Sequence, residues 1–105
     1  MNLKGTLPTL ILHVLSRGPN HGYRIAQEIK STSRGVLEFR EGTLYPDLHA
    51  LENKGLLESY EEVEQGRARR YYRITEDGRR ALAEQRKHWR VFSKAVTSIL
   101  EGSPS

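Results

Sequence analysis

Apolar residues near the start of the chain recur at helical spacing and predict a helix over about 4–16. Leu3, Leu7, Leu10 and Val14 form its stripe at intervals of four, three and four, and Ile11 and Leu15 widen it. Thr6 is the expected N-cap, and Pro8 fits a first turn, where an N–H would have no partner within the helix. The stripe is so wide that we expect this helix to be covered on more than one side.

The turn sequence Gly18-Pro19-Asn20 ends that helix, and a second helix is predicted over about 21–31. The side expected to be buried carries Tyr23, Ile25, Ala26 and Ile29. A very short strand is expected over 36–39, after a polar loop.

A third helix is predicted over about 43–54, with Gly55 as the residue that ends it. The expected buried stripe is Leu44, Leu48 and Leu51. The opposite side carries residues that form hydrogen bonds, at intervals of four: Tyr45, His49 and Asn53.

The period then changes from helical to alternating, which predicts strands over about 57–63 and 68–74 around Gln65-Gly66. The implied register contains six sensible cross-strand pairs: Glu64 with Arg67, Glu62 with Arg69, Glu61 with Arg70, Glu58 with Arg73, Tyr60 with Tyr71, and Leu57 with Ile74. Each such pair contributes roughly 0.2–1 kcal/mol, and agreement along the whole ladder favours a hairpin.

Thr75 is the expected cap of a last helix that reaches about Leu100. A seven-residue repeat runs along it: Gly78, Leu82, Gln85, Trp89, Phe92, Val96 and Ile99. Such a repeat is typical of a seam between helices. We expect residues 1–75 to form one unit and residues 76–105 a C-terminal dimerisation helix and tail.

The order of elements predicts a mainly α fold with a small β-hairpin, a winged helix-turn-helix followed by a long helix. In this fold the third helix enters the DNA major groove, while the hairpin reaches along the backbone. The 105-residue chain has 17 Lys and Arg against 13 Asp and Glu, a net charge of +4. Residues 67–90 contain nine basic and three acidic residues, a concentration that suits phosphate.

Some features count against nucleic acid. The four glutamates on the first strand can neutralise the arginines that face them, although Arg67 at the tip is the least affected. Asp47 and Glu52 put acids in the third helix, where Glu52 can instead serve structure.

Several classes of protein are excluded. The chain has no cysteine, which rules out disulfides and thiolate metal sites, and its four histidines show no metal-ligand spacing. We expect no metal, no cofactor and no catalytic residues. The apolar stretch 7–15 is too short to span a bilayer and no cleavage site follows it, so we expect a cytoplasmic protein with no membrane partner.

Several motifs resemble the PadR-like family of bacterial transcriptional regulators. They are Thr6-Leu7, Gly18-Pro19, His21-Gly22-Tyr23, Gly42-Thr43-Leu44-Tyr45-Pro46, Leu48, Leu51-Glu52, Gly55-Leu56 and Tyr72-Arg73-Ile74-Thr75-Glu76-Asp77-Gly78. The resemblance spans roughly 3–100 and is closest to the short subgroup with one C-terminal helix. It implies a homodimeric repressor of a palindromic operator in double-stranded DNA.

By matching position, the resemblance implies that Tyr45 contacts a phosphate; the alternative is a half-buried aromatic at the start of the helix. His49 and Asn53 are the candidates for contact with base edges, with ordinary exposed residues as the alternative, and Tyr72 is expected to pack under the wing. The expected DNA-binding residues are Arg40, Thr43, Tyr45, His49, Asn53, Lys54, Arg67, Arg69 and Arg70. The expected dimer-interface residues are Leu7, Leu10, Leu82, Trp89, Phe92, Val96 and Ile99. Gly22 and Gly42 are interpreted as positions that the backbone requires.

Trp89 has two interpretations. In some short PadR-like proteins that resemble this one, a tryptophan here stacks planar aromatic compounds between subunits, which implies a small aromatic effector. The alternative is an interface residue with no cavity beside it. For the whole chain, a winged-helix module for protein or RNA contacts is the alternative function, and an enzyme is the least favoured one.

Overall fold

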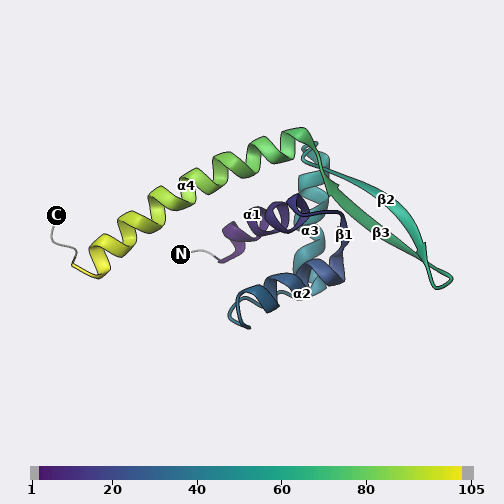
Figure 1. The fold of residues 1–105 in the computed structure, drawn as a ribbon, viewed down its shortest axis with the longest axis horizontal. Coiled ribbons are helices and arrows are strands. Elements are labelled where there is room, and N and C mark those ends of the chain that lie inside the picture. Colours follow the sequence, from purple (N-terminus) through teal and green to yellow (C-terminus); the bar gives the residue numbers. More distant parts are fainter. Residues whose placement is uncertain (1–2, 103–105) are drawn as a thin grey trace.

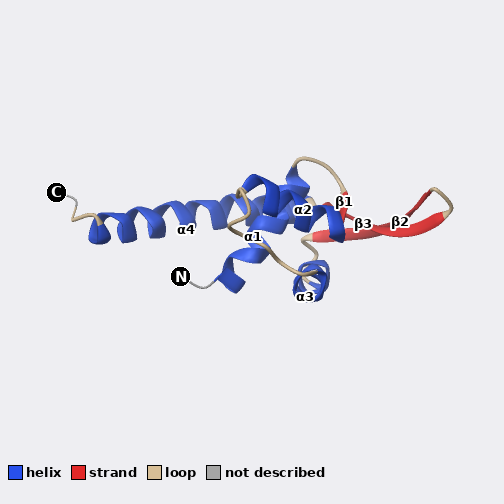
Figure 2. Ribbon diagram, turned by 90° about the horizontal axis from the view of Figure 1, so that it is seen from below, coloured by secondary structure: helices blue, strands red, loops and turns tan. Residues whose placement is uncertain are grey.

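The structure, a computed structural model, describes residues 3–102. Its elements in chain order are α1 (Leu3–Ser16), β1 (Asn20–His21), α2 (Gly22–Thr32), α3 (Glu41–Asn53), β2 (Leu57–Glu64), β3 (Arg67–Ile74) and α4 (Glu76–Leu100). Figure 1 shows α1, α2 and α3 gathered in a body from which the β2–β3 hairpin and α4 lead away in opposite directions, and Figure 2 shows the same from a second side. The expected fold class, mainly helical with a hairpin, is confirmed.

Helix α1 lies at the centre of the core, where its wide apolar surface is covered on several sides. Leu7, Ile11 and Leu12 have no exposed area, and Leu15 has 1%. Leu12 lay outside the predicted stripe, whereas the side chain of Leu3, which belonged to it, lies outside the described residues. Neighbouring elements thus bury almost the whole circumference of α1.

The start of α1 differs from the prediction. The helix begins at Leu3, so Thr6 lies within it and is not the N-cap. Pro8 is consequently the sixth residue of the helix and not part of its first turn.

The stretch from α2 to α3 contains two corrections. Tyr23 is 52% exposed, so it does not belong to the buried side of α2, which is formed by Ile25, Ile29 and the half-buried Ala26. The strand expected over 36–39 is absent from the described chain, which forms a turn and loop there. The Leu37 N–H donates to Ser33 Oγ at 2.9 Å, so side-chain turn chemistry replaces a strand ladder.

The predicted hairpin and its register are confirmed. All six pairs are present, among eight in total that run from Leu57 opposite Ile74 to Glu64 opposite Arg67. Gln65 and Gly66 both have positive φ, 50° and 78°, as a two-residue type I′ turn requires. The short strand β1 was not predicted; it pairs with β3 and gives a three-stranded sheet in the order β1-β3-β2.

Helix α4 begins as predicted and is held tightly to the corner between α3 and β2. Thr75 Oγ1 accepts the Gly78 N–H at 3.0 Å and donates to the Gly55 carbonyl at 2.7 Å. A Cβ added to Gly78 would lie 2.2 Å from the Leu56 carbonyl oxygen, so only glycine fits this contact. The first part of α4 then runs beside α1, and the rest extends beyond the body (Figure 1).

Candidate nucleic-acid interface

Helix α3 presents a dry side to the core and a polar side to solvent. Leu44 and Leu48 are fully buried and Leu51 is 4% exposed, as predicted. The polar residues expected on the other side are all exposed: Arg40, Thr43, Tyr45, His49, Asn53 and Lys54. A helix that is anchored by leucines and free on its polar side can enter a groove of a nucleic acid without unfolding.

Two of the motifs meet in space where Tyr45 packs on Gly22. A Cβ added to Gly22 would lie 3.2 Å from the Tyr45 hydroxyl oxygen and 3.3 Å from the ring carbon that bears it. Gly22 is buried at the start of α2, while Tyr45 remains 37% exposed. The missing side chain of Gly22 therefore sets where the Tyr45 hydroxyl lies. No such reason exists for Gly42, because nothing described lies within 4 Å of a Cβ added there.

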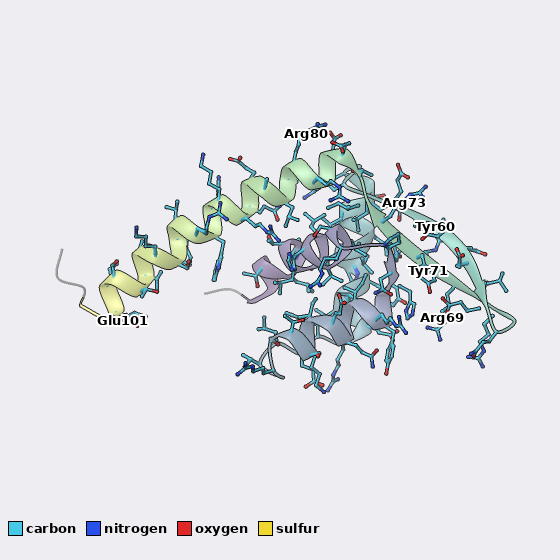
Figure 3. The ribbon with its side chains drawn as sticks, viewed as in Figure 1. Tyr60, Arg69, Tyr71, Arg73, Arg80 and Glu101 are labelled. Atoms are coloured by element: carbon cyan, nitrogen blue, oxygen red, sulfur yellow. The ribbon has the colours of Figure 1, made fainter. Side chains whose placement is uncertain are left out.

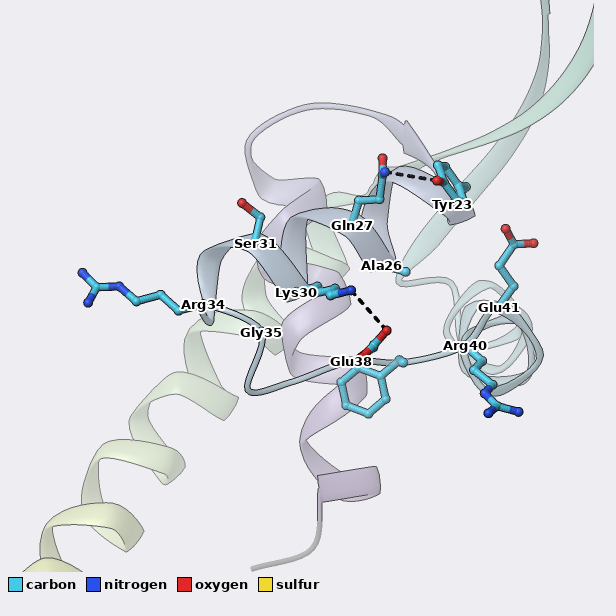
Figure 4. A pocket seen from close by; sticks show the side chains of 11 residues that line it. Tyr23, Ala26, Gln27, Lys30, Ser31, Arg34, Gly35, Glu38, Arg40 and Glu41 are labelled. Atoms are coloured by element: carbon cyan, nitrogen blue, oxygen red, sulfur yellow. Dashed lines mark hydrogen bonds and ion pairs between the residues drawn. The ribbon is translucent and has the colours of Figure 1, made fainter.

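A groove lies beside the entrance to α3. It has a volume of about 950 Å³ and lies between α2 and the segment 34–41 (Figure 4). Arg40 enters α3 in an extended conformation and caps no backbone N–H with its side chain. On the other wall, Tyr23 Oη accepts a hydrogen bond from Gln27 Nε2 at 3.2 Å, and Lys30 pairs with Glu38 at 3.2 Å. Arg40 is thus an exposed cation at the start of the helix.

One face of the hairpin turns toward the helices. Side chains opposite each other share a face, and the faces alternate along each strand. Ser59 lies opposite Tyr72, which is 1% exposed as predicted, and the next pair on that face is Glu61 with Arg70. Arg70 Nη1 donates to Ser59 Oγ at 3.0 Å, and Ser59 Oγ donates to Glu52 Oε2 at 2.5 Å. Glu52 therefore serves structure by tying α3 to the wing.

The opposite face carries a row of aromatic rings across the sheet. The rings of Tyr60 and Tyr71 stack at 5.8 Å, and His21 meets Tyr71 edge-on at 5.4 Å. Arg73 lies 5.2 Å from the centre of the Tyr60 ring, and Arg69 Nη1 lies 3.2 Å from His21 Nε2. Figure 3 labels the tyrosines and arginines of this row. Arg69 and Arg70, neighbours in sequence, thus lie on opposite faces of the wing.

The wing arginines are less neutralised than their facing glutamates suggested. Within the described chain only Arg73 forms an ion pair with a wing glutamate, Glu58, at 3.1 Å. Arg67, at the turn, forms no ion pair within the described chain. The carboxylate of Glu64, which lies opposite Arg67, accepts a hydrogen bond from the Tyr71 hydroxyl. Arg67 consequently remains the freest cation of the wing.

His21 has a role that the sequence did not reveal. It pairs with β3, and its Nδ1 accepts the Arg24 N–H at 3.5 Å, which caps α2. Burial first, and then the neighbouring Arg69, lower the pKa of His21 below 6.5. Because both ring nitrogens face N–H donors, a neutral ring accepts one hydrogen bond and a protonated ring accepts none. In the sequence, the only sign of this capping role was that His21 stands directly before a predicted helix.

The basic segment 67–90 does not form one surface. Its first part lies on the hairpin and its second part on α4, and these lead away from the body in opposite directions (Figure 1). The cations of this segment therefore form two separate groups and not one concentrated footprint, because β3 approaches the body from one side and α4 leaves it on the other (Figure 1).

The seven-residue repeat of α4 is also divided. Gly78 and Leu82 are buried within the chain, and Gln85 Oε1 accepts a hydrogen bond from Thr9 of α1. Beyond them the exposed fractions rise to 42% for Trp89 and 51% for Phe92, with 79% for Ile99. Leu7 and Leu82 were expected at a dimer interface. Their own chain buries both side chains, so they have almost no area left to contribute to one.

An apolar cavity of about 350 Å³ lies beside Trp89, between α1 and α4. Leu10, Leu37 and Leu82 line it, with Arg86 near His13. Burial first, and then Arg86, lower the pKa of His13 below 6.5. Among the described residues no cluster of three His, Cys, Asp or Glu could hold a metal. None of the described helices is long and apolar enough to cross a membrane.

Three helices with a free polar side on the third, followed by a hairpin, define a winged helix-turn-helix. Residues 11–84 match the family described as the transcriptional regulator PadR-like family, and the chain belongs to it. It is therefore a transcriptional regulator and not an enzyme.

Relatives agree with this assignment. The chain is 48% identical to the transcriptional regulator Rv3488 of Mycobacterium tuberculosis over 86 residues. This aligned stretch covers 82% of this chain and 78% of Rv3488. A transcriptional regulator from Clostridium thermocellum superposes with a TM-score of 0.85 at 30% identity, over 91% of each chain. Bacillus subtilis PadR in complex with operator DNA shares the fold, with a TM-score of 0.70 at 22% identity, over 76% of this chain and 46% of that one.

Proposed function

We propose that the protein binds operator DNA as a homodimer and represses transcription. The observation that carries the proposal is the free polar side of α3, held on a leucine side that is almost fully buried. The operator is double-stranded and palindromic, because a two-fold dimer presents two identical helices. This activity places the protein in the cytoplasm.

The recognition helix α3 enters the major groove. His49 and Asn53 contact base edges from its middle and end, and both side chains are exposed. Tyr45, held by Gly22, donates its hydroxyl to a phosphate, which fixes the register without reading sequence. The remaining contacts from this region are to phosphates and are made by Arg40, Thr43 and Lys54.

The wing contributes phosphate contacts that follow from its two faces. Arg67 projects from the turn without an ion pair in the described chain, and Arg70 lies on the face that also meets α3. Arg69 is held at His21 on the other face, so its contribution depends on how far the wing twists around the duplex. We assign the strongest contact to Arg67.

The dimer forms along α4. Trp89, Phe92, Val96 and Ile99 continue a seam whose first half packs on the chain's own α1. A second chain removes these exposed or half-buried side chains from water, and burial of apolar area contributes about 25 cal/mol per Å². Leu10, half-buried on α1, lies at the edge of the same surface. Residues 76–105 thus act as the dimerisation segment, with residues 1–75 as the DNA-binding unit.

A planar aromatic effector is the second part of the proposal. The cavity beside Trp89 has apolar walls, and a partly exposed indole can stack on a flat ring. Effector binding there changes the seam and hence the distance between the two recognition helices.

The test begins with selection of duplexes from a random-sequence pool by the wild-type protein. The selected duplex should bind with a steep salt dependence, losing roughly 10³–10⁵ in affinity between 50 and 200 mM salt if 6–10 phosphates are contacted. Arg67→Gln should weaken selected and unrelated duplexes alike, whereas Asn53→Ala should reduce discrimination between them. Arg80→Gln is the matched control, because Arg80 is exposed on α4 and pairs with Asp77.

Three outcomes contradict the proposal. Selection that enriches no sequence, or duplex binding that is insensitive to salt, would favour a winged-helix module for protein contacts. Tighter binding of single-stranded or structured RNA than of any duplex would favour an RNA-binding module. A Trp89→Ala protein that is still a dimer at micromolar concentration, but shows no heat of binding with an aromatic compound that the wild type binds, would support the effector site.

A further inference from the structure

We propose that the outer face of α4 binds a second segment of duplex DNA through its phosphates, an inference that rests on the operator binding proposed above. This outer face consists of Arg79, Lys87, Arg90 and Lys94, all exposed. One dimer would then bind its operator through the two α3 helices and another duplex through the outer face of α4.

The outer face is set opposite the seam by helix geometry. Successive residues turn by about 100°, so Lys87, Arg90 and Lys94, at intervals of three and four, form one stripe. This stripe lies on the far side of α4 from Trp89 and Phe92. A second chain that covers the seam therefore leaves the outer face in solvent.

The part of this face from Lys87 to Lys94 carries no acid, whereas Arg79 lies among Glu76, Asp77 and Glu84 in the sequence. Residues 85–100 contain four Lys and Arg and neither Asp nor Glu. In the described chain the four cations of the outer face form no ion pair. Arg80, which points away from the body in Figure 3, differs because Asp77 and Glu76 neutralise it. The hairpin differs as well, since its strands carry four glutamates and four arginines.

Hydroxyl groups accompany the cations. A shallow groove of about 460 Å³ near the end of the helix is lined by Arg90, Ser93, Lys94, Thr97, Ser98 and Glu101. Serine and threonine hydroxyls donate to phosphate oxygens in the same way as cationic side chains. Glu101 is the one acid of this groove and lies past the end of α4, so it marks where phosphate contacts stop.

A duplex fits this face better than a compact anion does. Arg79 to Lys94 span roughly 22 Å along a straight helix, which gives a line of charge and not a pocket. Duplex DNA carries one negative charge per about 1.7 Å of its axis, so it matches a long line of cations. Binding of an operator also raises the local concentration of neighbouring DNA, which favours a weak second contact.

The experiment uses the full chain and the duplex that it selects from a random-sequence pool. That duplex is immobilised and loaded with protein, and retention of a labelled, unrelated 40-base-pair duplex is measured at 50 mM salt. The variant K87Q/R90Q/K94Q should reduce retention at least tenfold while its affinity for the selected duplex changes less than twofold. The control K30Q/R34Q/R73Q removes the same charge from three exposed cations that lie outside α4, and it should retain the second duplex like wild type.

Each other outcome decides against the inference. Equal retention by wild type and K87Q/R90Q/K94Q would overturn it, as would no retention by wild type that has loaded normally onto the selected duplex. Retention lost equally in the control would show a net-charge effect and no defined face. Loss of binding to phosphatidylglycerol vesicles but not to duplex would assign the face to membranes. If no duplex is selected at the first step, the proposed function itself fails.

Discussion

Replacement of Gly78 by alanine tests how α4 is joined to the rest of the molecule. The added Cβ would lie 2.2 Å from the Leu56 carbonyl oxygen and 2.6 Å from Ile74 Cγ1. The first of these contacts is with backbone, so no side-chain rotation relieves it. The same carbonyl accepts the Thr75 N–H at 3.1 Å, which ties its position to the cap of α4.

Two opposing effects set the size of the change. Alanine in place of glycine inside a helix contributes about 1 kcal/mol through helix propensity. Overpacking of a filled site costs typically 1–3 kcal/mol, and this overlap is severe because it involves a backbone atom more than 1 Å inside ordinary contact. We expect the overlap to dominate and Gly78→Ala to lower the free energy of unfolding by about 2 kcal/mol.

Urea denaturation followed by circular dichroism measures this change, with the protein concentration held constant. Gly42→Ala is the matched control, since Gly42 is also helical and nothing described lies within 4 Å of its added Cβ. The control should be neutral or stabilising by up to about 1 kcal/mol. Equal stability of Gly78→Ala and wild type would refute the close packing of α4 on the corner at Leu56.

Three further perturbations address the site. Gly22→Ala should push the Tyr45 phenol by a few tenths of an ångström and weaken DNA binding several-fold with little loss of stability, as measured by fluorescence anisotropy and thermal unfolding. Gln65→Gly should stabilise the hairpin by roughly 1 kcal/mol in thermal unfolding, because Gln65 has a φ of +50°, where a side chain is strained. Because the pKa of His21 is lowered in the folded state, the unfolded state takes up protons first below pH 6.5, so stability should fall from that pH downward. His21→Gln should reduce the slope of that fall, and an unchanged slope would contradict the burial of His21 beside Arg69.

The sequence predicted the parts whose partners lie close along the chain. The register of the hairpin followed from the alternation of charges and tyrosines on two adjacent strands, and all of it is present. The leucine stripe of α3 and the cap at Thr75 are equally local and were also predicted. Such features depend on periods of 2 and 3.6 residues, which a single sequence contains.

Features that join distant segments were not predictable in the same way. Pairing of β1 with β3 brings His21 beside Arg69, which lies 48 residues further on, and a two-residue strand has no period. Tyr23 has the spacing of a buried residue, but the neighbouring segment 34–41 leaves a groove there and the ring stays exposed. Burial of His21 and Tyr23 depends on which distant segment packs against them, and the local sequence does not specify that segment.

The seven-residue repeat of α4 shows the same limit and also explains how its two halves can work together. A repeat indicates that one side of a helix is covered but not whether its own chain or a second one covers it. Here α1 covers Leu82, while Trp89 and Phe92 remain open. Because Gly78 clamps the start of the same helix to Leu56, between α3 and β2, a partner seated on the open half is rigidly connected to the recognition helix. In the proposed dimer, the spacing of the two α3 helices on a duplex would then depend on one continuous helix, and a ligand beside Trp89 would act at the point where its two halves meet.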